Sequence, residues 1–579
     1  MANFSFLTVR KEYVLFAPAC LEAEKVFKTS PVLCAIGCRK ALELAVKWVY
    51  SADKSLTLPY KDNLSALIYE DCFRQAVDEA TWKKLNYVVK LGNLAVHTNK
   101  TIDVGEAYQA LTTLFEFVQW LDYSYGREYR RRTFDAAQIP ALSVVVDVEK
   151  VKKQEALLVQ KQAEIERCQA EIAAQAEELS ALKTENRKKR VFVPTDISEW
   201  ETRKRYIDLD LKLMDWDFDH FVGQEIEVDN MAGVSGQKGY VDYVLFGQDG
   251  APLAVVEAKR TSKDPNVGKQ QAKLYADALE KQYGVRPMIF TTNGFETYFW
   301  DDLAAPQRPV FSVFSQDDLA RRMARRNSDI RLKGVKIDTA ITNRPYQLQA
   351  IAAVCDRFEK GFRRALLVMA TGTGKTRTVI SLVDVLMRGN YVKNVLFLAD
   401  RRALVGQAKE NFQAFLPDAS LCNLLSAKDN KNARIVFSTY PTILNAIDNV
   451  KNDKNERLFT PAHFDLIIVD EAHRSIFKKY KVIFDYFDAP IVGLTATPKT
   501  EVDRNTYDFF EVPHDNPTFS YDYETAVNVD RVLVPYRNPE VTTKFLEEGI
   551  VYDDLSEEDK ERYEEDFADE DGNIPDAIL

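Results

Sequence analysis

Apolar residues recur every three or four positions between about Tyr13 and Tyr125, the spacing that places side chains on one face of an α-helix. The pattern is clearest from Ala41 to Val49 and from Leu111 to Leu121. It predicts an all-helical N-terminal domain over residues 1–140. The end of this domain carries a basic group at Arg127–Arg132, which suits either a solvated helix end or a phosphate contact.

A different helical pattern follows. Residues 147–188 contain no Gly or Pro and are rich in Glu, Gln, Ala, Lys and Leu, which predicts one long helix within residues 141–190. Apolar residues repeat here every seven positions, at Val151, Leu158, Ile165, Ile172 and Leu179. The companion row three positions further on is mostly polar, whereas a two-stranded coiled coil needs both rows to be apolar. We therefore expect a spacer helix that leans on a neighbouring helix, with coiled-coil dimerisation as the alternative.

Short β-rich runs alternate with helical stretches after residue 190. An amphipathic helix is predicted at Trp200–Leu213 and a second helical stretch at Gln270–Leu279. Four strands are expected at 240–246, 253–256, 288–291 and 296–300. These elements predict a small α/β domain over residues 191–320, and the basic run Arg321–Arg326 then falls in a polar connector.

From about Ile341 the alternation of helices and apolar strands becomes regular. Strands are expected at 365–369, 394–398, 433–438, 466–469 and 491–494. Such alternation predicts a parallel, doubly wound sheet over residues 335–525, with a ligand at the loops that follow the carboxyl ends of its strands. The predicted fold class is thus a multidomain α and α/β protein.

Composition places these elements in a globular protein. The 579 residues are 46% hydrophobic and 28% charged, and the length is suited to about three or four domains. The seven cysteines are scattered without a CxxC pair, which argues against a disulfide framework or a zinc site. No signal region or membrane-spanning apolar run is found, so we expect a cytoplasmic protein without a membrane partner.

The net charge of -11 comes from one segment near the C-terminus. Between Phe545 and Asp571 there are 14 acidic and 2 basic residues, so the remainder of the chain carries +1. An acidic total therefore does not exclude a nucleic-acid-binding surface elsewhere. We interpret residues 526–579 as a solvated acidic segment.

The 191–320 domain contains the residue types of a metal-dependent nuclease. Asp242 lies in one predicted strand, and Glu257 and Lys259 lie at the end of the next. Residues two apart in a strand project to the same face, so Glu257 and Lys259 point together, and a hairpin across Gly247–Gly250 brings Asp242 to them. Two carboxylates can hold Mg²⁺ beside an ammonium group that orients water or stabilises charge. An exposed hairpin with ordinary surface charges is the alternative for these three residues alone.

The 335–525 domain contains the residue types of a nucleotide-hydrolysing motor. Met369 stands where a strict P-loop has its first glycine, and the run that follows has the composition of a phosphate-binding loop between a strand and a helix: Ala370, Thr371, Gly372, Thr373, Gly374, Lys375 and Thr376. Lys375 is expected at the β- and γ-phosphates and Thr376 at Mg²⁺. Asp470 and Glu471 end another apolar run, so Asp470 can hold Mg²⁺ and Glu471 can activate the attacking water.

The helix after the nuclease strands carries Gln271 and Tyr275, and with this QxxxY pair the set resembles the PD-(D/E)xK nucleases. The similarity is to the branch shared by RecB-like nucleases and the R subunits of type I restriction enzymes. It implies that Asp242 and Glu257 are metal ligands, that Lys259 is the catalytic lysine, and that Gln271 and Tyr275 position DNA or the site. It also implies an acidic residue on the preceding helix, either Glu201 or Glu199.

Six ordered motifs between Arg344 and Pro498 resemble those of superfamily 2 helicases and translocases. They are Arg344–Gln347, Ala370–Thr376, Ala399–Arg402, Ser438–Pro441, Asp470–His473 and Thr495–Pro498. The resemblance implies that Gln347 recognises adenine and that the loops at Ala399–Arg402 and Ser438–Pro441 contact the DNA backbone. His473 can instead pack as an ordinary core residue.

The order of nuclease before motor, together with Asp488–Pro490 and Tyr521–Tyr536, is similar to the R subunit of type I restriction-modification enzymes over about residues 190–540. This implies ATP and Mg²⁺ as cofactors, translocation of double-stranded DNA, and cleavage far from a site that separate methylation (M) and specificity (S) subunits recognise. A stand-alone repair or defence helicase-nuclease, and a non-catalytic DNA-binding scaffold, are the alternatives. Because such motors need a second lobe and few residues follow Tyr536, we expect the chain to be a fragment that binds ATP weakly and does not translocate.

The N-terminal domain resembles HEPN-like helical domains through Gly92, Asn93 and His97. Ribonucleases of that family have an arginine before the histidine, where this chain has Lys90. RNA cleavage is therefore not expected of it.

Overall fold

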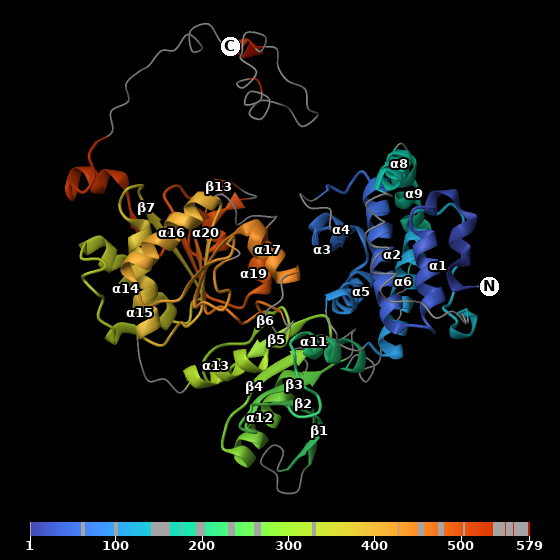
Figure 1. The fold of residues 1–579 in the computed structure, drawn as a ribbon, viewed down its shortest axis with the longest axis horizontal. Coiled ribbons are helices and arrows are strands. Elements are labelled where there is room, and N and C mark those ends of the chain that lie inside the picture. The colour runs from blue at the N-terminus through green and yellow to red at the C-terminus, as the bar shows by residue number, and fades with distance from the viewer. Residues whose placement is uncertain are drawn as a thin grey trace. The chain divides into compact units, whose positions relative to one another are not determined.

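A computed structural model of the chain describes residues 2–58, 64–97, 102–140, 162–190 except 174, 203–229, 238–259, 268–326, 332–449 except 427, 457–472, 480–501 and 504–535. It also describes the short or single positions 192, 264, 550–551, 560 and 577–578. The chain divides into two compact units, Met1–Tyr521 and Asp522–Leu579. The first unit contains the helical region, a mixed sheet and a parallel sheet (Figure 1). This confirms the predicted multidomain α and α/β fold class.

Six helices make up the first region: α1 (Ala17–Val26), α2 (Pro31–Ala52), α3 (Leu64–Tyr69), α4 (Asp71–Ala76), α5 (Glu79–His97) and α6 (Val104–Tyr125). 3₁₀ turns lie at Asn3–Val9, Lys11–Tyr13 and Ala136–Gln138. Helices α2 and α6 begin with side-chain caps. Ser30 accepts a hydrogen bond from the Leu33 amide at the start of α2, and Asp103 forms a capping box with Glu106 at the start of α6. Trp48 is fully buried where α2 meets its neighbours. The cysteines that the structure describes are all free thiols.

The predicted spacer is described from residue 162 as two helices, α8 (Gln162–Ala173) and α9 (Ala176–Lys189). Ile172 and Leu179 are buried in the helical core, α8 packs on α2, and α9 packs on α6. The apolar row of this segment therefore leans on a neighbour, as predicted, but the described part forms two helices and not the one long helix that the sequence predicted. Arg203–Ile207 forms a π-helical turn that leads into α11 (Asp208–Leu213), the described part of the predicted helix at Trp200–Leu213.

The second region is a six-stranded sheet in chain order: β1 (Val222–Val228), β2 (Gly239–Phe246), β3 (Pro252–Ala258), β4 (Met288–Thr292), β5 (Thr297–Trp300) and β6 (Arg308–Val310). Neighbours are antiparallel except β3 and β4, which run parallel because α12 (Lys269–Tyr283) connects them. The pairing of Tyr243 with Val256 confirms the predicted hairpin. The basic run predicted as a connector belongs instead to α13 (Gln316–Arg326).

The third region is a seven-stranded sheet of order β15-β7-β12-β11-β8-β10-β9, parallel throughout. Its strands are β7 (Arg364–Met369), β8 (Val395–Ala399), β9 (Leu421–Asn423), β10 (Ile435–Thr439), β11 (Leu466–Val469), β12 (Ile491–Thr495) and β15 (Phe519–Tyr521). Its helices are α14 (Pro345–Glu359), α15 (Lys375–Arg388), α16 (Arg402–Phe415), α17 (Tyr440–Asn449), α19 (Lys481–Tyr486) and α20 (Thr506–Phe509). All five strands that the sequence predicted here are present, so the doubly wound sheet is confirmed.

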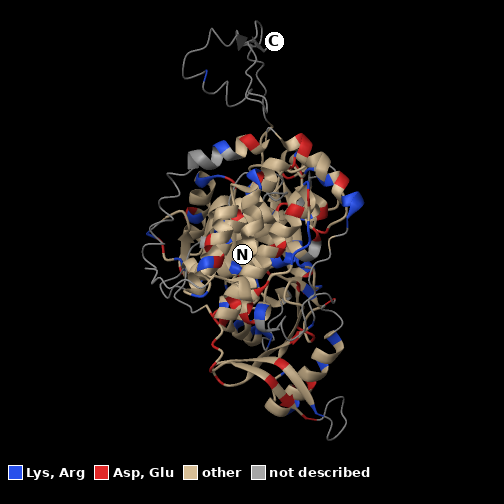
Figure 2. Ribbon diagram, turned by 90° about the vertical axis from the view of Figure 1, so that its right-hand side faces the viewer, with Lys and Arg blue, Asp and Glu red and all other residues tan. Residues whose placement is uncertain are grey.

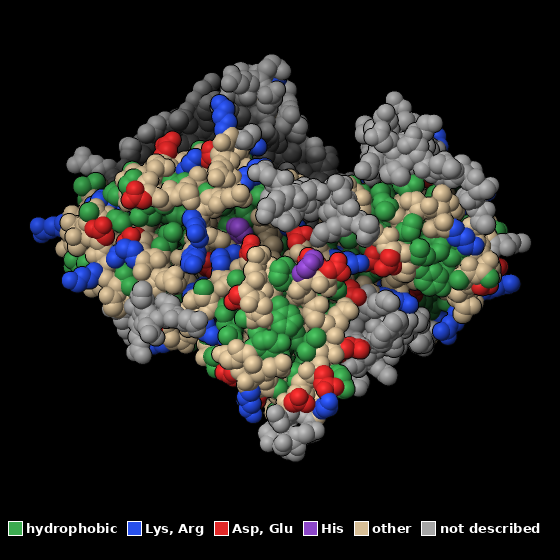
Figure 3. All heavy atoms as spheres, turned by 60° about the horizontal axis from the view of Figure 1, so that its bottom comes forward, with side chains coloured by type: hydrophobic (Ala, Val, Ile, Leu, Met, Phe, Trp, Pro, Cys, Tyr) green, Lys and Arg blue, Asp and Glu red, His purple; other side chains and the backbone are tan. Residues whose placement is uncertain are grey.

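Minor elements complete the described chain: a 3₁₀ turn at Leu332–Gly334, a π-helical turn at Thr525–Val529, and the short strands β13 (Thr500–Glu501), β14 (Arg504–Asn505), β16 (Ile550–Val551) and β17 (Ala577–Ile578). Among the described helices none has the length and apolar character needed to cross a membrane. Lys and Arg are interspersed with Asp and Glu along the described elements (Figure 2), and acidic, basic and apolar side chains intermix on the face shown in Figure 3. The acidic total is thus not reflected in the face shown in Figure 3.

Candidate active sites

The β2–β3 hairpin brings the two predicted carboxylates to the same end of the mixed sheet. The register that pairs Tyr243 with Val256 sets Asp242 beside the end of β3. The Asp242 Oδ2 atom accepts a hydrogen bond from the Ala258 amide at 2.8 Å, which fixes this carboxylate next to Glu257. The close approach follows from the two-residue period of the strands and the short turn between them.

Glu257 and Lys259 point to one face of β3 and form an ion pair of 2.6 Å between Nζ and Oε1. Their side chains are 3% and 13% exposed. The Lys259 amide also donates to the Thr292 carbonyl of β4, so the lysine backbone is held by the neighbouring strand. Removal from water strengthens this pair and gives the lysine a defined position.

Helix α12 adds the predicted glutamine and tyrosine. The Lys259 ammonium donates to Gln271 Oε1 at 3.4 Å, and Gln271 Nε2 donates to the Tyr275 hydroxyl oxygen at 2.7 Å. Burial raises the pKa of the Tyr275 phenol against the lowering effect of its bond with Gln271, and the carboxylates of Glu257 and Asp242 raise it further. The five residues therefore form one connected cluster.

Gly268 is a member of this site that the sequence did not single out. It is the N-cap of α12, and a Cβ placed on it would lie 2.8 Å from Lys259 Cε and 2.9 Å from Glu257 Cγ. Only the absence of a side chain lets the helix start so close to the ion pair. A glycine shortly before a helix was visible in the sequence, but its contact with β3 was not.

The donor set is compatible with part of a Mg²⁺ shell. Asp242 and Glu257 supply hard carboxylate oxygens, and Mg²⁺ commonly binds through one or two carboxylates while keeping several waters. No group of three or more His, Cys, Asp or Glu side chains that could hold a metal ion occurs within the described part of the chain. The predicted third acidic residue, Glu201 or Glu199, lies outside the described residues.

The phosphate-binding loop has the predicted strand, loop and helix context. It leaves β7 after Met369 and enters α15 at Lys375. Gly372 and Gly374 have φ values of 86° and 89°, a left-handed conformation that glycine adopts without steric cost. The loop thereby directs backbone amides and the N-terminus of α15 to one point, the geometry that binds phosphate.

Lys375 and the acidic pair meet at this loop. The Lys375 ammonium lies 4.0 Å from Glu471 Oε1 and donates to the Met369 carbonyl at 3.3 Å. Burial and then the adjacent Glu471 carboxylate raise the pKa of Asp470 to about 6. A divalent cation would relieve this crowding of negative charge, so the donor chemistry of Asp470 with the Thr376 hydroxyl fits Mg²⁺.

Gln347 contacts the loop through its side-chain amide. Its Nε2 atom donates to the carbonyls of Thr373 and Gly374 at 3.0 and 3.3 Å, and Thr342 donates to its Oε1 atom. Tyr346 was not assigned a role from the sequence, yet its hydroxyl donates to the same Thr373 carbonyl at 2.8 Å.

Tyr346 also stacks on the ring of Tyr521, with centroids 3.9 Å apart and planes within 4°. The Tyr521 carbonyl accepts from the Ala370 amide at 2.9 Å, at the start of the phosphate-binding loop. The two tyrosines therefore hold this loop at its start and at its middle. The sequence offered no signal for this, because Tyr521 is separated from Tyr346 by most of the domain.

The remaining motor motifs follow the carboxyl ends of neighbouring strands: Asp400 and the exposed Arg401 after β8, Thr439 at the end of β10 and Thr495 at the end of β12. His473 lies outside the described residues. In the helical domain the Lys90 ammonium pairs with Asp210 at 2.6 Å, and the side chain of His97 is not among those described. The HEPN-like character of this domain stays a prediction.

Comparison with known proteins found three family models that match parts of the chain. Residues 106–308 match the family model of the type I restriction enzyme R protein N terminus, and residues 340–500 match that of the type III restriction enzyme res subunit. Residues 21–141 match a domain of unknown function, DUF4145.

The curated relatives that the chain resembles are endonuclease subunits of type I restriction enzymes. The chain is 32% identical over 51% of its length to the EcoAI type I restriction enzyme endonuclease subunit of Escherichia coli, and 28% identical over 55% to the EcoKI endonuclease subunit of Escherichia coli strain K12. The matches cover 37% and 32% of those relatives, so the chain spans about a third of their length. Among solved structures, the Pyrococcus furiosus Hef helicase domain is 23% identical over 34% of this chain and 42% of its own, with a TM-score of 0.27.

Proposed function

We propose that this HsdR-like chain carries the endonuclease domain and the first motor domain of a type I restriction enzyme R subunit. The observation that carries the proposal is the presence, in order along one chain, of a Glu257–Lys259 pair linked to Gln271 and a phosphate-binding loop faced by Asp470 and Glu471. The matches to the R protein N terminus and to the res subunit support the same assignment.

In the nuclease domain the proposed reaction is hydrolysis of a DNA phosphodiester. Asp242 and Glu257 would hold Mg²⁺, which when bound polarises the phosphate and lowers the pKa of a water. Lys259 stands beside Glu257, where its ammonium can orient water or stabilise charge on the phosphate. Gln271 receives a hydrogen bond from Lys259 and donates one to Tyr275, so it keeps the ammonium directed into the site.

The motor domain is proposed to contribute the first lobe to ATP hydrolysis, which the complete R subunit couples to translocation of double-stranded DNA. The phosphate-binding loop and Lys375 would bind the phosphates, Thr376 and Asp470 would hold Mg²⁺, and Glu471 would activate the attacking water. Gln347 is proposed to recognise adenine at the loop it contacts. DNA, and methylation and specificity subunits in the cytoplasm, are the proposed partners.

The test compares variants of the full-length R subunit in the complex assembled with methylation and specificity subunits. Asp242→Ala or Lys259→Ala is expected to abolish DNA cleavage and retain DNA-stimulated ATP hydrolysis, whereas Lys375→Ala is expected to abolish both. Failure of the chain to assemble with those subunits, with nuclease activity retained, would favour a stand-alone helicase-nuclease. Cleavage that survives both nuclease substitutions would refute the assigned site.

A further inference from the structure

The arginines of α13 form hydrogen bonds with the motor domain. Arg321 Nη2 donates to the carbonyls of Ala462 and His463 at 2.9 and 3.1 Å, and Arg325 Nη1 donates to the Tyr391 carbonyl at 3.0 Å. All three acceptors lie in the 335–525 region. A run of arginines that could have contacted phosphate thus contacts protein within the described structure.

The same helix carries an acidic contact with the motor domain. Asp318 is 1% exposed, and its Oδ2 atom accepts from the Thr460 hydroxyl at 2.6 Å. Arg321 pairs with the other oxygen of Asp318 at 2.8 Å, which fixes the arginine in the direction of its carbonyl partners. Helix α13 therefore contacts the motor domain through an acidic and a basic side chain.

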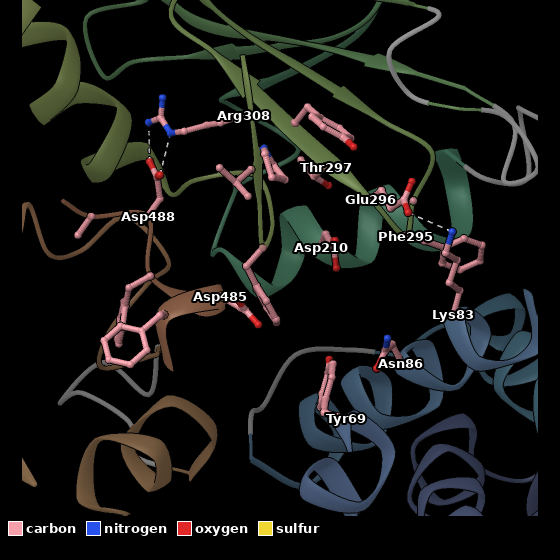
Figure 4. Close-up of a pocket in the computed structure, with 18 of the residues that line it drawn as sticks. Tyr69, Lys83, Asn86, Asp210, Phe295, Glu296, Thr297, Arg308, Asp485 and Asp488 are labelled. Carbon is pink, nitrogen blue, oxygen red and sulfur yellow. Dashed lines mark hydrogen bonds and ion pairs between the residues drawn. The ribbon is translucent and has the colours of Figure 1, made fainter. Parts of the chain in front are cut away.

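Asp488 is the centre of the contact. Arg308 of β6 binds it through two parallel hydrogen bonds of 2.8 and 2.7 Å (Figure 4). Arg322 of α13 lies 2.9 Å from its Oδ2 atom and also donates to its carbonyl at 2.9 Å. Arg363, which precedes β7, donates to its Oδ1 atom at 2.8 Å. One carboxylate of the motor domain thus binds arginines of both domains.

This cluster is buried and electrostatically satisfied. The Asp488 side chain is 7% exposed; burial raises the pKa of its carboxyl, but Arg363, Arg308 and Arg322 outweigh burial and hold the pKa well below its usual range. The excess positive charge lies over aromatic faces, with Arg308 4.8 Å from the Phe299 ring centroid and Arg322 4.8 Å from that of Phe314. Bidentate pairs of this kind fix orientation as well as proximity.

A further ion pair joins two domains near the Asp488 cluster. The cluster forms part of the wall of a cavity of about 710 Å³ (Figure 4) that residues of all three domains line. On the opposite side of it, Lys83 of the helical domain pairs with Glu296 of the nuclease domain at 3.1 Å. The Asp488 cluster and the Lys83–Glu296 pair join charged residues of this lining across the domains, so we assign no ligand to the cavity.

The position of the cluster links it to the nucleotide site. Arg363 directly precedes β7, which ends in the phosphate-binding loop, and Asp488 closely precedes β12, which ends at Thr495. β7 and β12 are neighbouring strands in the parallel sheet. Two adjacent strands, each only a few residues long, therefore separate the cluster from the loops that would respond to ATP.

We propose that Asp488 is a positioning residue that clamps the nuclease domain to the first motor domain, so that the two move as one body and changes at the phosphate-binding loop reach β6 and α13. The second part rests on the proposed ATP function. The clamp itself depends only on the contacts of Asp488 with Arg308 and Arg322.

The test is amide hydrogen exchange on the full chain, with Asp488→Asn and Asp488→Ala compared with Asp429→Asn. Asp429 pairs with Lys409 inside the motor domain and is the matched control. Loss of a buried ion-pair partner should speed exchange in β6 and α13 by roughly tenfold or more. Asp429→Asn should leave these segments unchanged.

The coupling is measured by adding ADP and Mg²⁺. In the unmodified chain, exchange is expected to slow in the phosphate-binding loop and also in β6 and α13; in Asp488→Asn it should slow in the loop alone. Unchanged exchange in β6 and α13 of both Asp488 variants without nucleotide would overturn the clamp. Lack of protection in the loop itself would instead count against the proposed ATP site, which keeps the two failures apart.

Discussion

Replacing Gly268 by alanine tests the nuclease site with the smallest available change. The residue has φ of -82° and ψ of -4°, which alanine adopts without strain, so the backbone need not respond. The added Cβ would lie 2.8 Å from Lys259 Cε and 2.9 Å from Glu257 Cγ. All of the effect must therefore appear as displacement of these two side chains or of the start of α12.

The size of the displacement follows from contact distances. Carbon atoms pack at about 3.5–4.0 Å, so the neighbours must retreat by roughly 1 Å. Glu257 lies near the end of the central strand β3 and the whole residue is 2% exposed, whereas the side chain of Lys259 can move at its flexible end. A misplacement of about 1 Å in a catalytic group can cost on the order of 100-fold in rate. Stability should fall by no more than the roughly 1–3 kcal/mol typical of overpacking.

The assay is Mg²⁺-dependent DNA cleavage by the assembled enzyme, with ATP hydrolysis measured in the same samples. Gly268→Ala should lower cleavage by about 10- to 100-fold and leave ATP hydrolysis unchanged. Gly284→Ala is the control for stability, because its φ of +72° makes alanine unfavourable while the added Cβ meets nothing within 4 Å. Equal loss of cleavage in both variants, or none in Gly268→Ala, would refute the steric reasoning.

Three further changes test other parts of the chain. Gly374→Ala should weaken nucleotide binding by about tenfold or more in a fluorescence titration, because the residue has φ of +89° and the new Cβ would lie 2.6 Å from Gln347 Nε2. Tyr346→Phe removes a hydroxyl bond to the phosphate-binding loop and should weaken binding by about fivefold in the same titration, with a loss of roughly 1 kcal/mol in unfolding free energy. Burial alone would raise the pKa of Asp53, but hydrogen bonds, first of all the one from Lys183, lower the pKa from 3.8 to about 2. The ionised carboxylate therefore stabilises the folded chain above pH 3.8, and this stabilisation is lost as the pH falls through 2. Denaturant unfolding of Asp53→Asn should show a weaker loss of stability over that interval than the unmodified chain; an identical pH profile would contradict the assignment.

The motor domain was predictable because its strands are continuous apolar runs. Each run of the parallel sheet is buried on both faces and is followed by a motif at its carboxyl end, so sequence order gives the strands and the loop positions together. β15 escaped prediction since it has only three residues and pairs with β7 from about 150 positions away. The stretch Tyr521–Tyr536 was noted for its resemblance to the R subunit, but the contact of Tyr521 with the phosphate-binding loop was not predicted.

The positions of the nuclease residues were predictable where they depend on local geometry alone. Asp242, Glu257 and Lys259 come together through strand alternation and one short hairpin, both of which are properties of neighbouring residues. The role of Gly268 depends on how closely α12 starts to β3, and the domain's edge strand β1 lacked a clear apolar alternation. Contacts between elements are set by packing, which a single sequence does not display.

The arginines of α13 show why the partners of charged residues were the least predictable feature. A basic run has the same composition whether it faces phosphate, solvent or a protein carboxylate. What decides is the partner, and Arg322 finds its partner Asp488 at a sequence separation of 166 residues. In the sequence Asp488 was noted only as part of the stretch Asp488–Pro490 that resembles the R subunit. Nothing there showed that the carboxylate is buried against three guanidinium groups from separate elements. A buried charge of this kind is costly unless every partner is in place. We therefore propose that the Asp488 cluster specifies one arrangement of the nuclease and motor domains more strictly than apolar packing would.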